Sequence, residues 1–132
     1  MRIGELARRA GVSARVLRYY EQRGLLSSGR DANGYRRYEG EAAVERVRRI
    51  RELLATGLNT EDIRTLLPCA QGGPGLVPCA LSSGIVDRQM AQLDAEIAEL
   101  MERRAALGAY AQVMRERGAQ DRALAERALR SA

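Results

Sequence analysis

The chain has 132 residues, enough for one ordinary domain with a modest core, and its only aromatic residues are five Tyr. A core that depends on Leu, Ile, Val and Ala favours packed helices over a β-sandwich. No apolar run reaches the roughly 18 residues of a membrane span, so we expect a cytoplasmic protein with no membrane partner, whose two Cys are reduced thiols.

Positive charge is concentrated in the first half of the chain. All 22 basic residues are Arg, and residues 1–68 hold 14 of them against 9 acidic residues, a net charge of +5. Residues 69–132 hold 8 Arg and 8 acidic residues and are neutral. A basic unit joined to a neutral one is typical of a domain that binds a polyanion, which we call the head, followed by a segment that mediates assembly. A basic surface that only contacts solvent fits the charge distribution equally well.

The first 25 residues predict two short helices joined by a tight turn. Apolar residues recur at helical spacing over residues 3–10 and stop at Gly11, and Ser13 offers an N-cap hydroxyl to a second helix that ends near Gly24. The pair forms a helix-turn-helix, a signal of moderate specificity because unrelated helix pairs also turn at a Gly. Its second helix would present three side chains outward: Arg15, Arg18 and Tyr19.

The basic segment 30–38 predicts a tight β-hairpin. Its Asn33-Gly34 pair favours a two-residue turn in which both residues have positive φ. A short basic hairpin beside a recognition helix is a wing, whose Arg side chains can reach phosphates and whose Tyr side chains can stack or donate a hydrogen bond. A plain surface turn is the alternative, and Tyr38 fits core packing as well as it fits DNA contact.

Two further helices complete the head, and a linker follows. Apolar residues from Ala43 to Leu54 carry a third helix that ends at Thr56-Gly57, and a fourth is expected to be capped by Thr60 and stopped by Pro68. The Gly and Pro residues beyond Pro68 exclude regular helix throughout the next stretch. We therefore expect four parts: a DNA-binding head (1–68), a hinge (69–84), a dimerisation helix (85–117) and a short helical tail (118–132).

Beyond the hinge, apolar residues alternate steps of four and three for about four repeats, which is a heptad pattern. A helix that is polar on its other faces cannot bury such a stripe alone and needs a partner. The same helix of a second copy is the expected partner, and a hairpin with residues 121–130 folding back is the alternative. We call the expected dimer interface the seam, and it comprises Val86, Met90, Leu93, Ile97, Leu100 and Leu107.

The order of these elements and the residues within them resemble the MerR family of transcriptional regulators. The strings Leu17-Arg18-Tyr19-Tyr20-Glu21 and Gly34-Tyr35-Arg36-Arg37-Tyr38 are highly specific at this spacing. The resemblance is close over residues 1–67 and looser over 85–117. It implies a mainly α fold, in which a winged helix-turn-helix head of four helices and a short hairpin precedes a long antiparallel coiled-coil dimerisation helix.

The resemblance also implies a function. A homodimer would bind a pseudo-palindromic element of double-stranded promoter DNA, and would bend and untwist it so that RNA polymerase engages when an effector changes state. The DNA contacts carried over from the family are Arg18, Tyr19, Tyr35, Arg36 and Arg37, then Ser13 and Arg15, with Tyr38 included at the base of the wing. An enzyme is disfavoured, because the chain has no His, no nucleophile motif and no Gly-rich phosphate loop after a strand.

The effector end departs from the family pattern. Metal-sensing members carry a Cys-rich loop after the dimer helix and the redox member carries four Cys there, whereas this chain has no Cys beyond Cys79. Drug-sensing members carry a large C-terminal ligand domain, which the residues after residue 117 are too few to form. The remaining candidates for an effector site are Cys69 and Cys79, at the hinge.

Several interpretations of Cys69 and Cys79 stay open, and no cofactor is certain. The pair fits inert packing, a thiol–disulfide switch, or a thiophilic metal ion that would need further ligands from a second protomer. A regulator that senses a small molecule and has structural cysteines is a further alternative. So is an architectural protein that bends DNA without any effector.

Overall fold

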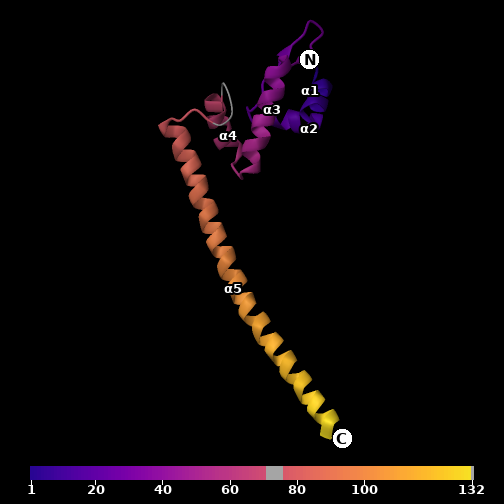
Figure 1. Cartoon of the computed structure of the whole chain (residues 1–132). Helices are drawn as coiled ribbons and strands as arrows, with labels where there is room; N and C mark the ends of the chain where they lie inside the picture. The colour runs from indigo at the N-terminus through magenta and orange to yellow at the C-terminus, as the bar shows by residue number, and fades with distance from the viewer. Residues whose placement is uncertain (71–75, 132) are drawn as a thin grey trace. The chain divides into compact units, whose positions relative to one another are not determined.

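The computed structural model describes residues 1–70 and 76–131, and almost all of its regular structure is helical. The elements in chain order are α1 (Ile3–Ala10), α2 (Ala14–Gln22), β1 (Gly29–Arg30), β2 (Arg36–Arg37), α3 (Gly40–Ala55), α4 (Thr60–Leu66), the 3₁₀ helix η1 (Leu67–Ala70) and α5 (Ala80–Ser131) (Figure 1). They divide into two units, Met1–Gln89 and Met90–Ala132. The mainly α fold with a winged helix-turn-helix and a long last helix is confirmed, whereas the antiparallel pairing of that helix with a second copy stays a prediction.

The helix-turn-helix forms where its capping residues predict it. Gly11 takes the left-handed conformation, with φ of 72°, and ends α1. The Ser13 hydroxyl then accepts a hydrogen bond from the Val16 N–H at 3.1 Å and caps α2. α1 packs against both α2 and α3 (Figure 1), and their inward faces form one core. Its largest fully buried residues are Leu6, Leu17, Leu25, Val44, Val47, Ile50, Ile63 and Leu66.

The wing is a two-stranded antiparallel hairpin in which Gly29 pairs with Arg37 and Arg30 with Arg36. The predicted two-residue turn is wrong, because Gly34 has a φ of 80° but Asn33 does not have positive φ. The Gly34 N–H donates to the Asp31 carbonyl and the Asp31 N–H donates to the Tyr35 carbonyl, both at 3.0 Å. The loop is therefore the three-residue type, a tight turn followed by a left-handed Gly.

α4 begins at Thr60, where the fourth helix is predicted, but its predicted cap is wrong. The side chain of Asn59, not of Thr60, caps α4 by accepting from the Asp62 N–H at 2.8 Å. α5 begins at Ala80, inside the stretch predicted as hinge, and runs through residues 118–131 without a separate tail (Figure 1). After Pro78 the chain has no proline, and a Gly within a helix costs only about 1 kcal/mol, which explains the uninterrupted helix.

None of the helices over residues 1–70 and 76–131 is long and apolar enough to cross a membrane.

The first turns of α5 belong to the same compact unit as the head, Met1–Gln89. The Ile85 side chain enters the core and is 9% exposed. Arg88 forms an ion pair with Asp62 of α4 at 2.5 Å, and the Gln89 amide donates to the Thr56 carbonyl at 2.9 Å. One helix therefore contributes its start to the head and its remainder to the second unit.

Replacing Ile85 with Ala should lower the free energy of unfolding by about 2 kcal/mol, because the change removes buried contacts and leaves a cavity in the head. Urea unfolding at one fixed protein concentration measures the effect. The matched control is Leu81→Ala, one turn earlier on α5, where the side chain is 61% exposed. The control should change stability by no more than about 0.5 kcal/mol, and equal losses in the two variants would contradict the packing of Ile85.

Candidate nucleic-acid interface and thiol pair

The outward face of α2 carries the side chains predicted for DNA recognition. Arg15, Arg18 and Tyr19 are all exposed, and the Arg23 guanidinium lies 5.4 Å from the centre of the Tyr19 ring. Ser13 is exposed too, but its hydroxyl oxygen is already used as the N-cap of α2. Ser13 is thus suited to place the helix and, through its hydroxyl proton, to donate to a phosphate.

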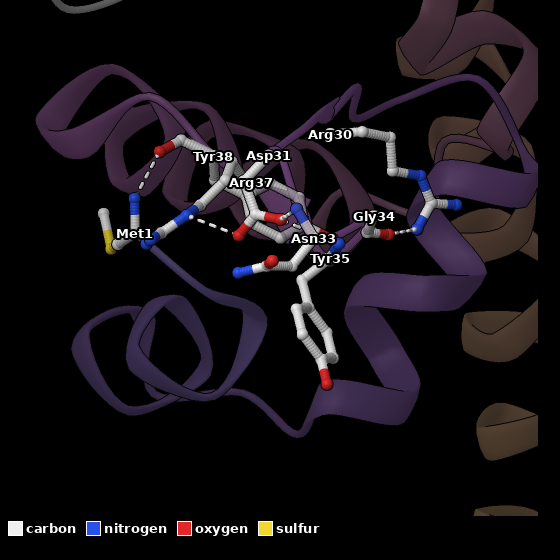
Figure 2. Close-up of polar contacts among 8 residues, drawn as sticks. All are labelled: Met1, Arg30, Asp31, Asn33, Gly34, Tyr35, Arg37 and Tyr38. Atoms are coloured by element: carbon white, nitrogen blue, oxygen red, sulfur yellow. Dashed lines mark hydrogen bonds and ion pairs between the residues drawn. The ribbon is translucent and has the colours of Figure 1, made fainter.

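A single carboxylate shapes the loop of the wing (Figure 2). Asp31 Oδ1 accepts from the backbone N–H groups of Asn33 at 2.9 Å and Tyr35 at 3.0 Å, and Oδ2 pairs with Arg37 Nε at 3.3 Å. Slight desolvation opposes ionisation of Asp31, but these backbone hydrogen bonds and the Arg37 charge outweigh it and keep the pKa of Asp31 below its usual value. The Tyr35 ring projects away from the loop and stays 56% exposed (Figure 2).

Tyr38 anchors the base of the wing in the core, so its prediction as a DNA contact is corrected. The side chain is 3% exposed and its hydroxyl donates to Glu21 Oε1 at 2.8 Å. Burial, reinforced by Glu21, raises the pKa of Tyr38 to about 12 and keeps the hydroxyl a donor. The Tyr38 backbone also exchanges hydrogen bonds with Met1 at 2.7 and 2.8 Å (Figure 2), which ties the wing to α1.

Arg36 shares Glu21 with Tyr38. Its Nε lies 3.0 Å from Glu21 Oε2, and the side chain is only partly exposed. Desolvation alone would raise the pKa of Glu21, but hydrogen bonds from Ser28 and Tyr38 and the positive charge of Arg36 lower it overall. Glu21 therefore stays ionised and orients Arg36 beside the recognition helix.

A cleft of about 240 Å³ lies between α2 and the wing. Four arginines line it, Arg2, Arg18, Arg30 and Arg36, together with Ile3, Gly34 and Tyr35, and the lining includes no carboxylate. Arg30 donates to the Gly34 carbonyl at 3.1 Å, and the Arg2 guanidinium lies 4.6 Å from the centre of the Tyr35 ring. A cleft lined by four arginines and no carboxylate suits the phosphates of a nucleic acid.

The sequence prediction did not include Arg2 or Arg30. The hairpin register pairs Arg30 with Arg36 on the neighbouring strand. Arg30 could therefore have been identified from the sequence as the residue opposite a predicted DNA contact. Arg2 gave no such signal, because it precedes α1 and reaches the cleft only through the tertiary fold.

The two cysteines lie close together in the head unit. Cys69 is in η1, Cys79 directly precedes α5, and both are free thiols. Their sulfur atoms are 3.9 Å apart, and the Val77 N–H donates to the Cys69 carbonyl at 2.6 Å. Residues 71–75, within the predicted hinge, lie outside the described residues. The fold thus brings together two thiols that the sequence placed at opposite ends of a linker segment.

Ser82, which the sequence prediction did not include, controls the surroundings of Cys79. It is 3% exposed, its Oγ accepts from the Cys79 N–H at 3.0 Å and lies 3.2 Å from Cys79 Sγ, and its own N–H donates to that sulfur at 3.3 Å. The hydrogen bonds of the Ser82 hydroxyl and backbone lower the pKa of the Cys79 thiol to about 7. Desolvation, then the adjacent Cys79 sulfur, raises the pKa of Cys69 above its usual value.

The seam is exposed in the single chain. Val86 is partly buried in the head unit, whereas Met90, Ile97, Leu100 and Leu107 are each more than half exposed. A lone helix has nothing in its own unit against which to bury these side chains. The dimer interface therefore remains a prediction, supported by an apolar stripe that lacks cover within one chain.

The comparisons with known proteins agree with this architecture. The model of MerR HTH family regulatory proteins matches residues 1–69, and the model described as MerR, DNA binding matches residues 44–110. The transcriptional regulator ZntR of Escherichia coli K12 is 37% identical over 100 residues, which cover 75% of this chain and 70% of ZntR.

Two solved structures extend the similarity to the fold. The transcription regulator PbrR691 from Ralstonia metallidurans CH34, in complex with lead(II), is 32% identical with a TM-score of 0.66, over 81% of each chain. HiNmlR, a MerR family regulator lacking the sensor domain and bound to promoter DNA, is 26% identical with a TM-score of 0.52, over 80% of this chain and 82% of its own. The chain therefore belongs to the MerR family, whose members are DNA-binding transcription regulators and not enzymes.

Proposed function

We propose that the protein acts as a homodimer that binds double-stranded promoter DNA and changes the shape of that DNA in response to a signal at Cys69 and Cys79. The observation that carries the DNA-binding part is the cleft between α2 and the wing, where four arginines converge without a carboxylate in the lining. HiNmlR, a relative of similar fold, is bound to promoter DNA in its structure, which supports the same role here.

The α2 face and the wing have different tasks in this proposal. Arg15 and Tyr19 would enter the major groove from α2, with Ser13 at a phosphate near the start of the helix and Arg18 at a phosphate beside the cleft. Tyr35, Arg36 and Arg37 would clamp the backbone from the wing. Because phosphate contacts carry no base information, selectivity would come from the few α2 contacts and from the ease with which the central DNA deforms.

The homodimer part of the proposal depends on the seam. Two copies of α5 packed antiparallel would cover the apolar side chains that one copy exposes, and would hold two heads on one pseudo-palindromic site. A change in how the two heads hold the DNA would then alter the alignment of the promoter elements that RNA polymerase reads. RNA polymerase is thus a partner through the shared promoter.

The signal is proposed to act on the thiols themselves. A tetrahedral ion such as Zn²⁺ would need ligands beyond the described residues of one chain, because a closed tetrahedral site needs four ligands and residues 1–70 and 76–131 hold no group of three or more candidate ligands. An apolar effector has little support either. The hollow of about 1080 Å³ between the wing, α3 and η1 is lined by many charged side chains, among them Glu39, Glu45 and Arg46.

Replacing Arg18 or Arg37 with Ala should weaken DNA binding and reduce its dependence on salt, because each lost phosphate contact makes the slope of log K against log [salt] shallower by about 1. The probe is a duplex that the wild-type protein selects from a random pool, titrated at several salt concentrations. Arg122→Ala, at an exposed arginine of α5 outside the proposed interface, is the control and should keep the wild-type slope.

A purely architectural protein would behave differently in the same titration. It would bind the selected duplex and a scrambled one almost equally, whereas a regulator should prefer the selected duplex by a factor of about 1,000 or more. If both arginine variants kept the wild-type affinity and slope, the proposed interface would be wrong.

Placing Glu at both Leu93 and Ile97 should convert the protein into a monomer, because the two carboxylates would face a desolvated partner helix. Sedimentation velocity at a concentration where the wild type is dimeric measures the change. The control places Glu at Ala91 and Ala98, exposed positions of the same helix that lie off the seam, and should stay dimeric. An intact dimer in the Leu93, Ile97 variant would exclude the seam as the interface.

A further inference from the structure

Cys79 and Ser82 form a reciprocal pair at the start of α5. The Cys79 N–H donates to Ser82 Oγ at 3.0 Å, and the Ser82 N–H donates to Cys79 Sγ at 3.3 Å. This is the pattern of a capping box, with a thiol in the place usually held by a Ser or Thr hydroxyl. The sulfur is thereby held in one position, and it also stays exposed to solvent.

A second thiol lies directly beside this sulfur. Cys69 is half-buried in η1, and its Sγ is 3.9 Å from Cys79 Sγ, so the two atoms need to approach by less than 2 Å to reach the about 2.05 Å of a disulfide. We propose that Cys79 and Cys69 form a reactive dithiol in which Cys79 attacks a low-molecular-weight disulfide and Cys69 converts the adduct into an internal disulfide. Its role as the regulatory signal rests on the proposed function, whereas the thiol chemistry itself does not.

The reaction has two exchange steps. The Cys79 thiolate attacks one sulfur of the small disulfide RSSR, the S–S bond breaks, and RS⁻ leaves with the electron pair. Cys69 then loses its proton to solvent and attacks Cys79 Sγ, and the second RS⁻ leaves. Both leaving groups are protonated by solvent according to their own pKa values. The balance is RSSR plus two protein thiols giving one protein disulfide plus two RSH, so the small disulfide is reduced as the protein is oxidised.

The surroundings of the two sulfurs explain why Cys79 attacks first and Cys69 second. Cys79 is exposed, and the Ser82 hydrogen bonds that bring its pKa to about 7 favour the thiolate near neutral pH. Thiols attack disulfides fastest when their pKa lies near the ambient pH. Cys69 is half-buried and its pKa is raised, so it is the poorer first nucleophile, but it lies close enough to attack an adduct on Cys79. Ser82 acts as the positioning residue.

The first test uses 5,5′-dithiobis(2-nitrobenzoic acid) as the small disulfide, with the full-length protein and no DNA. The wild type should release two equivalents of aryl thiolate and keep no aryl group, as mass spectrometry would show by a loss of two hydrogens. Cys69→Ser should keep the fast first release, stop after one equivalent and retain the adduct. Cys79→Ser should react at least threefold more slowly at pH 7.

The second test compares Ser82→Ala with Ser83→Ala, an exposed neighbour on the same helix, each in the Cys69→Ser background. Loss of the Ser82 hydroxyl should raise the pKa of Cys79 toward the usual value of about 8.5. The lower thiolate fraction, partly offset by higher nucleophilicity, should slow the reaction about threefold at pH 7 and speed it about threefold at pH 9. Ser83→Ala should show neither change. A merely loosened structure would not produce this crossover.

The outcomes decide between the dithiol and its alternatives. Equal first rates in Cys69→Ser and Cys79→Ser, or an aryl group retained on both sulfurs of the wild type, would overturn the proposal. An internal disulfide that forms as described, but leaves the shape of the bound DNA unchanged in a bending assay, would refute the signalling role in the proposed function and leave the dithiol chemistry standing. Dithiothreitol should restore both free thiols.

Discussion

The packing of the first turns of α5 onto the head is the constraint on which the rest of the structure depends. Ile85 fills the core, Arg88 pairs with Asp62, and Gln89 binds the carbonyl of Thr56, where the chain turns from α3 toward α4. Because the helix continues without a break to Ser131, the element that completes the head also carries the seam. Any movement at the start of α5 is therefore felt by α3 and α4 as well.

Carboxylates within the head hold two of the arginines proposed to contact DNA. Asp31 binds Arg37, and Glu21 binds Arg36 together with the hydroxyl of Tyr38. These pairs are partly exposed, so each contributes little to stability, but they limit the rotamers of long side chains before DNA arrives. Binding to phosphate would then exchange one anionic partner for another, and less side-chain entropy would be lost at the interface.

The sequence predicted those parts of the fold that depend on local patterns. Helical spacing, the Gly11 turn and the Ser13 cap are local, and they placed α1 and α2 correctly. The wing loop was mispredicted because the Asp31 carboxylate, and not the Asn33-Gly34 pair alone, decides its shape. The preference of Asn33-Gly34 for a two-residue turn is overridden by the hydrogen bonds of the Asp31 side chain, two residues before Asn33.

The remaining errors concern contacts between distant parts of the chain. Tyr38 fits a wing contact or a core residue equally well until Glu21, on another element, accepts a hydrogen bond from its hydroxyl. Ile85 lies off the heptad spacing, which was a hint of a second task for α5, but only the fold shows that the head receives it. Arg2 likewise reaches the arginine-lined cleft through the tertiary fold, at a position that no spacing rule encodes. Ser82 is a different kind of omission, because it follows Cys79 at the three-residue spacing of a capping box and was missed only because the cap is a Cys.

The thiol of Cys79 has a mechanical consequence for α5, because it caps the helix that it precedes. A thiolate at a helix N-terminus interacts favourably with the macrodipole and accepts from a first-turn amide, whereas a sulfur joined in a disulfide is neutral and a weak acceptor. The first turn should therefore fray more easily once the sulfur is oxidised, and its amide protons should exchange faster with solvent. Since that turn holds the buried Ser82 and leads directly to Ile85, the chemistry of one sulfur atom influences how firmly the start of α5 is held in the head.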